Sequence, residues 1–259
     1  MNKKRAFLAL ILLLISLGLF VFYLYGARQR VLPPEPIEPV ENTDIEPEPV
    51  PEPEPEPIEV EPEEPYESPI DFEYWQGECS DIYAWIKVPG TQVDYPVVRN
   101  TDDPDYYLRK DIYGRYLFAG TLFTQSSYNG DDFSDRVTII YGHNMPDGSM
   151  FGGLQYTYSY YDKFTENNEF FIYLPEKELH YDIIASLPFS NLHVMELYNR
   201  FETDEDVKDF LTYVLGVHYV NSCKAEGLIP TGKEHLVILQ TCRFDNFGER
   251  YLVIGRLSE

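Results

Sequence analysis

The chain has 259 residues, with 44 acidic and 20 basic side chains and a formal net charge of −24. This length allows one or two domains. The acidic excess persists in residues 72–259, which carry 29 acidic and 15 basic side chains. Because binding to phosphate backbones requires a basic surface, this composition argues against nucleic acid as a partner.

The chain contains three cysteines, Cys79, Cys223 and Cys242. An odd number excludes a framework in which every cysteine is paired within the chain. The chain is also long enough to form a hydrophobic core without disulfides. A disulfide between Cys79 and Cys223 remains open, because the sequence carries no information on their separation in space.

The first 30 residues are typical of a membrane anchor. Basic residues at positions 3–5 precede residues 6–26, which carry no charge and are rich in Leu, Ile and Phe. About 20 apolar residues span a bilayer, whereas a cleaved signal peptide usually has an apolar run of ~7–15 residues. We therefore predict an uncleaved anchor over residues 1–30. The predicted localisation is the cell membrane, with a single pass, a cytoplasmic N-terminus and an extracellular folded domain.

Residues 31–71 form a segment rich in proline and glutamate. Between residues 33 and 71 lie 13 of the 20 prolines and 15 acidic residues, with no Lys or Arg. Proline restricts φ and neighbouring glutamates repel one another, so we expect an extended, semi-rigid linker. The remaining residues, 72–259, form the predicted folded domain.

Within this domain, residues 71–85 predict a short helical lead-in, and short β-branched and aromatic runs between turn signals predict strands. One later segment, residues 203–220, has apolar residues at a helical period, with Thr203 and Asp206 as an N-terminal cap. The pattern predicts a mainly β-fold, a barrel with one long helix inserted late. The predicted strands are 84–88, 95–98, 121–123, 137–141, 169–173, 179–187, 235–241 and 250–257.

Cys242 follows the strand-like run 235–241, and Arg250 begins the last run. If the two runs form a hairpin, Cys242 and Arg250 face each other with Cα atoms about 5 Å apart. A neighbouring arginine favours the thiolate and can bind a developing oxyanion. A cysteine at a strand end also occurs as simple packing, so this pair alone leaves the role open.

His143 ends a second strand-like run, in Tyr-Gly-His-Asn-Met at 141–145. A cysteine and a histidine that the fold brings together form the minimal nucleophilic pair. No cluster has the spacing of metal ligands, so we predict no metal and no cofactor. The other histidines are scattered and are interpreted as structural or surface residues: His180, His193, His218 and His235.

Together these motifs resemble the sortase family, the cell-wall transpeptidases of Gram-positive bacteria. The resemblance rests on the motif at 141–145, Thr-Cys at 241–242 and the arginine eight residues after that cysteine. Ser-Met-Phe-Gly-Gly-Leu at 149–154 and the helix at 203–220 resemble class B in particular. The resemblance spans residues 83–257. It implies a closed eight-stranded sortase-type β-barrel, with a helical lead-in and a long helix inserted before the cysteine strand.

The resemblance implies Cys242 as nucleophile, His143 as general acid and base, and Arg250 as the cation that binds substrate and oxyanion. Two other arginines compete for the last role. Arg243 adjoins the thiol and should point to the opposite strand face, and Arg256 lies about 20 Å beyond Arg250 at strand rise. Arg250 is therefore preferred.

Three further residues are expected to line the site, and no catalytic role is assigned to them: Tyr141, Asn144 and Thr241. The sequence departs from the pattern of the family at Thr-Leu-Phe-Thr-Gln, residues 121–125. Sortases often have an aspartate after this hydrophobic strand.

The implied reaction is acyl transfer from a sorting motif in an exported protein to an amine, through a thioester on Cys242. The expected partners are surface proteins with a C-terminal sorting motif, an amine of peptidoglycan precursor or a pilin lysine, and the membrane through the N-terminal helix. Two alternatives remain: a surface cysteine protease, or a non-catalytic binding module on a stalk in which Cys242 is merely buried.

Overall fold

A computed structural model of the chain describes residues 66–246 and 248–258. The predicted anchor at 1–30 and nearly all of the predicted linker at 31–71 lie outside these residues. The first described helix, α2, spans Phe72–Glu78, and the Asp71 side chain accepts a hydrogen bond from the backbone N–H of Tyr74 at 2.9 Å. This cap explains why the lead-in becomes helical directly after the proline-rich segment.

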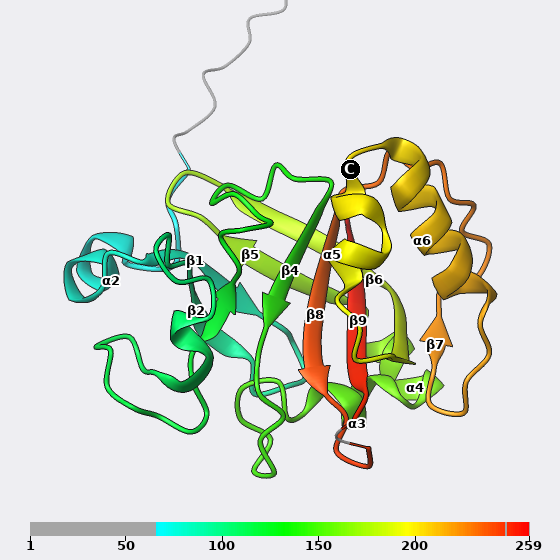
Figure 1. Ribbon diagram of the computed structural model, residues 1–259, viewed down its shortest axis with the longest axis horizontal. Coiled ribbons are helices and arrows are strands. Elements are labelled where there is room, and N and C mark those ends of the chain that lie inside the picture. The colour runs from blue at the N-terminus through cyan, green and yellow to red at the C-terminus, as the bar shows by residue number, and fades with distance from the viewer. Residues whose placement is uncertain (1–65, 247, 259) are drawn as a thin grey trace, which may run out of the picture. The chain divides into compact units, whose positions relative to one another are not determined.

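The described part of the chain alternates strands with short helices (Figure 1). In chain order, after α2, the elements are β1 (Ile82–Lys87), β2 (Asp94–Val98), η1 (Tyr106–Arg109), β3 (Leu122–Thr124), β4 (Val137–Tyr141), α3 (Leu154–Tyr158), α4 (Tyr161–Glu166), β5 (Glu169–Tyr173), β6 (Glu178–Phe189), α5 (Val194–Leu197), η2 (Asn199–Phe201), α6 (Asp204–Gly216), β7 (Cys223–Lys224), β8 (Leu236–Cys242) and β9 (Arg250–Leu257).

Eight of these strands close into a barrel. Their order is β5-β1-β2-β3-β4-β8-β9-β6, and the pairing of β5 with β6 completes the ring. Strands β2 and β3 run parallel, as do β4 and β8, whereas the other neighbours are antiparallel. The two-residue β7 pairs with β6 outside the ring. The predicted closed eight-stranded barrel is confirmed.

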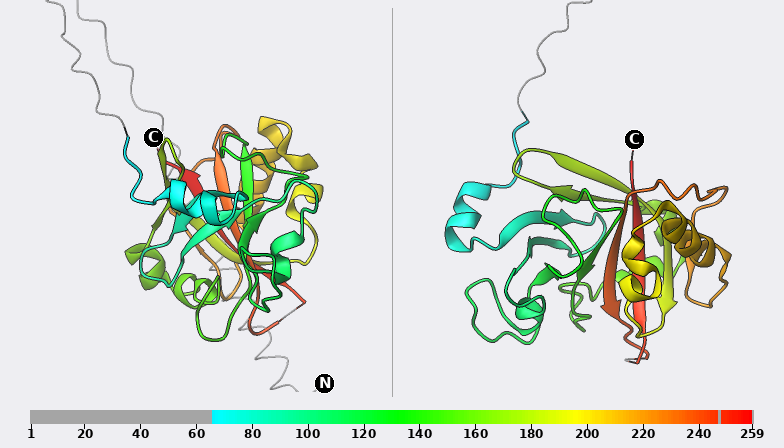
Figure 2. Two further views of the ribbon diagram at one scale, coloured as in Figure 1. Left: turned by 90° about the vertical axis from the view of Figure 1, so that its left-hand side faces the viewer. Right: turned by 45° about the horizontal axis from the view of Figure 1, so that its top comes forward.

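The strand β8 shows how sequence pattern and burial are related. Val237 and Leu239 pack in the inner core, and Leu236 and Ile238 pack in a second cluster on the outer face. Helices α5 and α6 lie against that outer face, beside β8 and β9 (Figures 1 and 2). A strand covered on both faces needs a continuous apolar run rather than an alternating one.

The long helix predicted at 203–220 is present as α6, but it is shorter. Thr203 and Asp206 form the predicted cap, each side chain bonding the backbone N–H of the other. The helix ends at Gly216, and Val217 is already extended, with φ −77° and ψ 152°. Glycine and β-branched valine are poor helix formers, which explains the earlier end.

The sequence did not predict β7, α3, α4 or α5. These elements have only two to six residues. Helices this short are not stable in isolation, so tertiary packing determines them and local propensity carries little signal.

The predicted localisation requires correction. Among residues 66–246 and 248–258, no helix has the length and apolarity needed to cross a membrane. The longest helix described, α6, has 13 residues, and roughly 20 are needed. The segment at 6–26, on which the prediction was based, lies outside the described residues. We therefore withdraw the single-pass placement, with its cytoplasmic N-terminus and extracellular domain, and the membrane as a partner.

Candidate active site

The ends of three strands meet at one edge of the barrel. Strand β4 runs parallel to β8 with Tyr141 opposite Gln240, so both strands end at the same edge. Strand β9 runs antiparallel to β8 and begins there, with Arg250 opposite Cys242. The pairing of Cys242 with Arg250 expected for a hairpin is thus present. His143 follows β4 at the same edge, although it lies 99 positions before the cysteine along the chain.

Arg250 is the described arginine that reaches the thiol. Its Nη1 lies 3.6 Å from Cys242 Sγ. Arg243 instead pairs with Asp245 and Glu249. Arg256 pairs with Asp182 at 3.6 Å, at the other end of β9. The geometry therefore selects the same arginine that the spacing had favoured.

His143 is held by the connection between β2 and β3. Its Nε2 lies 2.8 Å from the backbone oxygen of Leu108, and its ring stacks on Phe118 with centroids 6.1 Å apart. A carbonyl oxygen only accepts hydrogen bonds, so Nε2 carries a proton and Nδ1 is the free nitrogen of the neutral ring.

The protonation of His143 depends on this surrounding. Burial lowers its pKa below the ordinary 6.5, and the positive charge of Arg109 lowers it further. The hydrogen bond to Leu108 raises the pKa but does not offset these two effects. Desolvation and a nearby cation both penalise the imidazolium. The histidine is therefore mainly neutral at neutral pH and can accept a proton.

His143, Cys242 and Arg250 all line one cavity of about 220 Å³. Tyr141 and Thr241 also line it, as the sequence had indicated. Its remaining walls come from η1 and the segments beside it, from β3 and the residue after it, from the segment before α5, from the residue after β4 and from β8. These residues are Asp105, Leu108, Thr121, Phe123, Gln125, Asn191, Leu192, His193, Gly142 and Gln240.

Asn144 does not line this cavity but supports it. Its Nδ2 donates a hydrogen bond to the backbone oxygen of Cys242 at 2.7 Å. This bond connects the segment after β4 directly to the end of β8.

A polar chain in the cavity wall was not anticipated. Gln125 donates from Nε2 to Asp105 Oδ1 at 2.7 Å, and its Oε1 lies 2.9 Å from His193 Nε2. His193 Nε2 is also 3.1 Å from the hydroxyl of Tyr141. His193 had been interpreted as structural or surface, and it is a wall residue of the site. Gln125 directly follows β3, in the segment where the sequence departs from the family pattern, and Asp105 supplies a carboxylate beside it from another segment.

The other two cysteines lie away from this site. Cys79 and Cys223 are free and buried, whereas Cys242 is only partly buried. The disulfide that the sequence left open is therefore not formed. Burial raises the pKa of Cys223, which keeps its thiol protonated.

No protein-family model matches the chain. The chain is, however, similar to a known protein, sortase B of Listeria monocytogenes. The two are 31% identical over 182 residues, and the matched region covers 68% of this chain and 70% of the relative. The chain belongs to the class B sortases.

Solved structures agree with this assignment. Sortase B of Clostridium perfringens is similar with a TM-score of 0.62 at 25% identity, over 72% of this chain and 99% of that one. A Streptococcus pyogenes class B sortase involved in pilus biogenesis is similar with a TM-score of 0.61 at 27% identity, over 73% of this chain and 98% of that one.

As a sortase, the protein is a transpeptidase that acts on surface proteins. This family membership argues against the alternative of a non-catalytic binding module. A sortase uses a cysteine, and Cys242 is the cysteine that lines a cavity together with a histidine and an arginine.

Proposed function

We propose that Cys242 is the nucleophile of this sortase, His143 its general acid and base, and Arg250 the cation that binds the substrate carbonyl and its oxyanion. The observation that carries the proposal is the 3.6 Å contact between the Arg250 guanidinium and Cys242 Sγ. The contact lies in the cavity that His143 also lines.

In the first half-reaction, His143 takes the proton of the Cys242 thiol, and the thiolate attacks the carbonyl carbon of a threonine in a sorting motif. The carbonyl electron pair moves to oxygen, where Arg250 donates hydrogen bonds to the negative charge. The carbon–nitrogen bond then breaks, and the imidazolium of His143 protonates the leaving amine. The product is a thioester on Cys242.

In the second half-reaction, an acceptor amine attacks the thioester carbon. The neutral imidazole of His143 removes the amine proton, and the carbon–sulfur bond breaks to release the thiolate. The lowered pKa of His143 supports this step, since it keeps the ring neutral and able to accept a proton. The acceptor is an amine of the cell wall or of a pilin, and the similar Streptococcus pyogenes enzyme involved in pilus biogenesis makes the pilin a candidate.

We further propose that the catalytic domain comprises residues 72–259 and follows a linker rich in proline and glutamate. The capped start of α2 at Phe72 supports this boundary.

The test is to incubate the full-length chain with threonine-containing peptides and to measure covalent adducts by mass spectrometry. We expect an acyl adduct on Cys242 and none with Cys242→Ala. Cys223→Ala, which removes a buried free thiol, is the matched control and should retain the adduct.

Adding an amine acceptor separates transfer from hydrolysis. A sortase should release a peptide–amine conjugate, whereas the surface protease considered above would release the free acid at the same rate with or without the amine. An adduct that persists in Cys242→Ala would refute the proposed nucleophile.

A further inference from the structure

The turn between β8 and β9 is too long to determine its own geometry. Strand β8 ends at Cys242 and β9 begins at Arg250, so seven residues connect them. Hairpin register is set by the turn itself mainly in loops of about 2–5 residues. The β8–β9 ladder places Cys242 opposite Arg250, but a turn of this length needs contacts outside the hairpin to hold one conformation.

Gln155 on α3 supplies such support. Its Oε1 accepts a hydrogen bond from the backbone N–H of Phe244 at 3.1 Å, and its Nε2 donates to Asp245 Oδ1 at 3.1 Å. Both ends of the amide thus bind the turn. Only 1% of Gln155 is exposed, and burying an amide is costly unless it is hydrogen-bonded.

Asp245 extends this attachment to Arg243. The guanidinium of Arg243 donates to both carboxylate oxygens of Asp245 and also to Glu249 at the other end of the turn. Arg243 holds the pKa of Asp245 down to about 2, so this carboxylate is charged at all physiological pH values. The turn is therefore closed by charged contacts and fastened to α3 by one glutamine.

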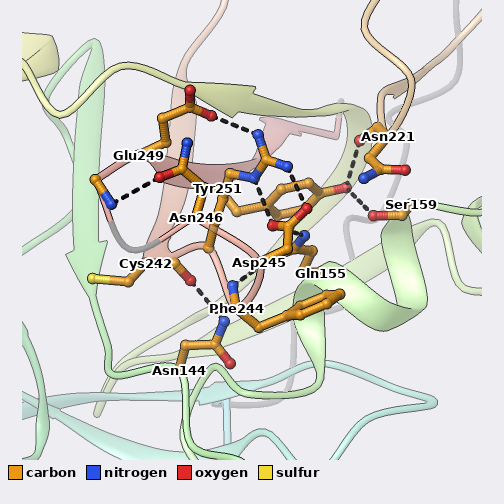
Figure 3. A network of polar contacts seen from close by, with 12 residues as sticks. Asn144, Gln155, Ser159, Asn221, Cys242, Phe244, Asp245, Asn246, Glu249 and Tyr251 are labelled. Carbon is orange, nitrogen blue, oxygen red and sulfur yellow. Dashed lines mark hydrogen bonds and ion pairs between the residues drawn. The ribbon is translucent and has the colours of Figure 1, made fainter.

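These contacts lie on the side of the strand away from the reactive sulfur. Figure 3 shows the Cys242 side chain pointing away from Asp245 and Gln155, with Asn144 bound to the Cys242 backbone. Because Arg243 is engaged on that side, it does not compete with Arg250 for the thiol. The side-chain hydrogen bonds of Gln155 go to Phe244 and Asp245 and not to Cys242 or Arg250, so it acts on that pair through the turn.

We propose that Gln155 is a positioning residue: it fastens the β8–β9 turn to α3 and so holds the Arg250 guanidinium at the Cys242 thiol. This inference rests on the roles proposed above for Cys242 and Arg250. Loss of the glutamine releases the turn, and the arginine then spends less time beside the sulfur. Misplacing a group at the reacting centre by about 1 Å can lower the rate on the order of 100-fold.

The test uses two alkylating agents on the full-length chain. Iodoacetate is an anion and iodoacetamide is neutral, so the ratio of their rates at Cys242 reports the positive charge beside the sulfur. In the Arg250→Gln variant we expect this ratio to fall by about fivefold, the effect of one unit charge near 4 Å in water. Gln155→Leu should lower the ratio towards the same value.

The matched control is Gln76→Leu. Gln76 also donates a side-chain hydrogen bond to a backbone oxygen, that of Ile82 at 3.1 Å, but it lies on α2 away from the site. This variant should keep the wild-type ratio. The double variant of Gln155→Leu and Arg250→Gln should show no further loss beyond Arg250→Gln, because both changes act on the same contact.

A merely stabilising role would lower the temperature of unfolding in Gln155→Leu and leave the ratio unchanged, and that result would overturn the proposal. If Gln155→Leu does not fold, Gln155→Met removes the same two hydrogen bonds with a side chain of closer length, and a wild-type ratio in that variant is equally decisive. Peptide turnover is measured in parallel. If the wild-type enzyme forms no covalent adduct with any peptide, the proposed function is refuted. The alkylation ratio remains a separate test of the positioning role of Gln155.

Discussion

At the scale of single residues, neighbours set the protonation of His143, on which the proposed mechanism depends. The bond to Leu108 determines which nitrogen carries the proton, and it raises the pKa. Burial and the charge of Arg109 act in the other direction and prevail. Arg109 is itself held in place, with its guanidinium 4.3 Å from the centre of the Phe118 ring that stacks on the histidine.

Arg109→Gln tests this balance. Removing a cation stabilises the imidazolium, so the pKa of His143 should rise and the acidic limb of the transfer rate should move to higher pH. The titration of His143 can be followed directly by NMR. Arg115→Gln is the control, because Arg115 lies in the same connection and pairs with Asp111. An unchanged titration in Arg109→Gln would show that this charge does not reach the imidazole.

At the scale of elements, α6 is held by its cap and by one apolar face. Val207, Phe210, Leu211 and Val214 are buried in the outer cluster. At the N-terminus, the Thr203 hydroxyl accepts from the Asp206 N–H at 3.2 Å, and Asp206 accepts from the Thr203 N–H at 2.8 Å. These bonds satisfy donors that the helix itself leaves free.

Thr203→Ala should therefore lower the free energy of unfolding by about 1 kcal/mol. Thr165→Ala is the control, since the Thr165 hydroxyl bonds only to carbonyls of the preceding turn of α4. Urea unfolding measures both variants. Because α6 does not line the cavity, peptide turnover should stay at the wild-type level, and a large loss of turnover would contradict the separation of α6 from the site.

At the scale of the whole molecule, closure of the barrel constrains residues that no local pattern identifies. Gly255 lies in β9, and a Cβ atom there would overlap the ring of Phe170 on β5 and approach Tyr181 on β6. Both aromatic side chains are almost fully buried and stack on each other with centroids 5.0 Å apart. They have little room to move, so the close approach of these strands requires glycine.

Gly255→Ala should reduce the free energy of unfolding by about 1–3 kcal/mol through overpacking. Gly216→Ala is the control, because beyond the helix's own neighbouring backbone nothing lies within 4 Å of the added methyl group. Alanine in a helix is also favoured over glycine by up to about 1 kcal/mol, so this control should be neutral or stabilising. Equal stabilities of the two variants in denaturant would show that the barrel tolerates the methyl group.

Local pattern predicted much of the barrel. Strands β4, β5 and β9 begin and end where the sequence predicted, because each is a dense run of apolar residues. The same reasoning extended the long helix past Gly216 and did not find α3, which carries Gln155. A single turn of helix has too few residues to show a period, and its stability comes from the surface on which it packs.

The residues of the candidate site also fall into two groups, those that the sequence could predict and those that it could not. His143, Cys242 and Arg250 could be singled out because reactive side chains at strand ends form a recognisable motif. His193, Gln125 and Asp105 could not, because each is an ordinary polar residue in a connection. Their shared place in the wall depends on contacts across long stretches of the chain.

The sequence by itself determined which segments form the eight barrel strands and which residues are candidates for the chemistry, since both follow from side-chain type and from periods of a few residues. The tertiary structure decided which strands are neighbours, and thus that the parallel pairing of β4 with β8 brings His143 to the cysteine edge. It also decided that Arg243 is engaged by Asp245 and Glu249, which leaves the thiol to Arg250. Pairing and burial depend on the whole chain at once, because each contact exists only when the rest of the barrel is closed.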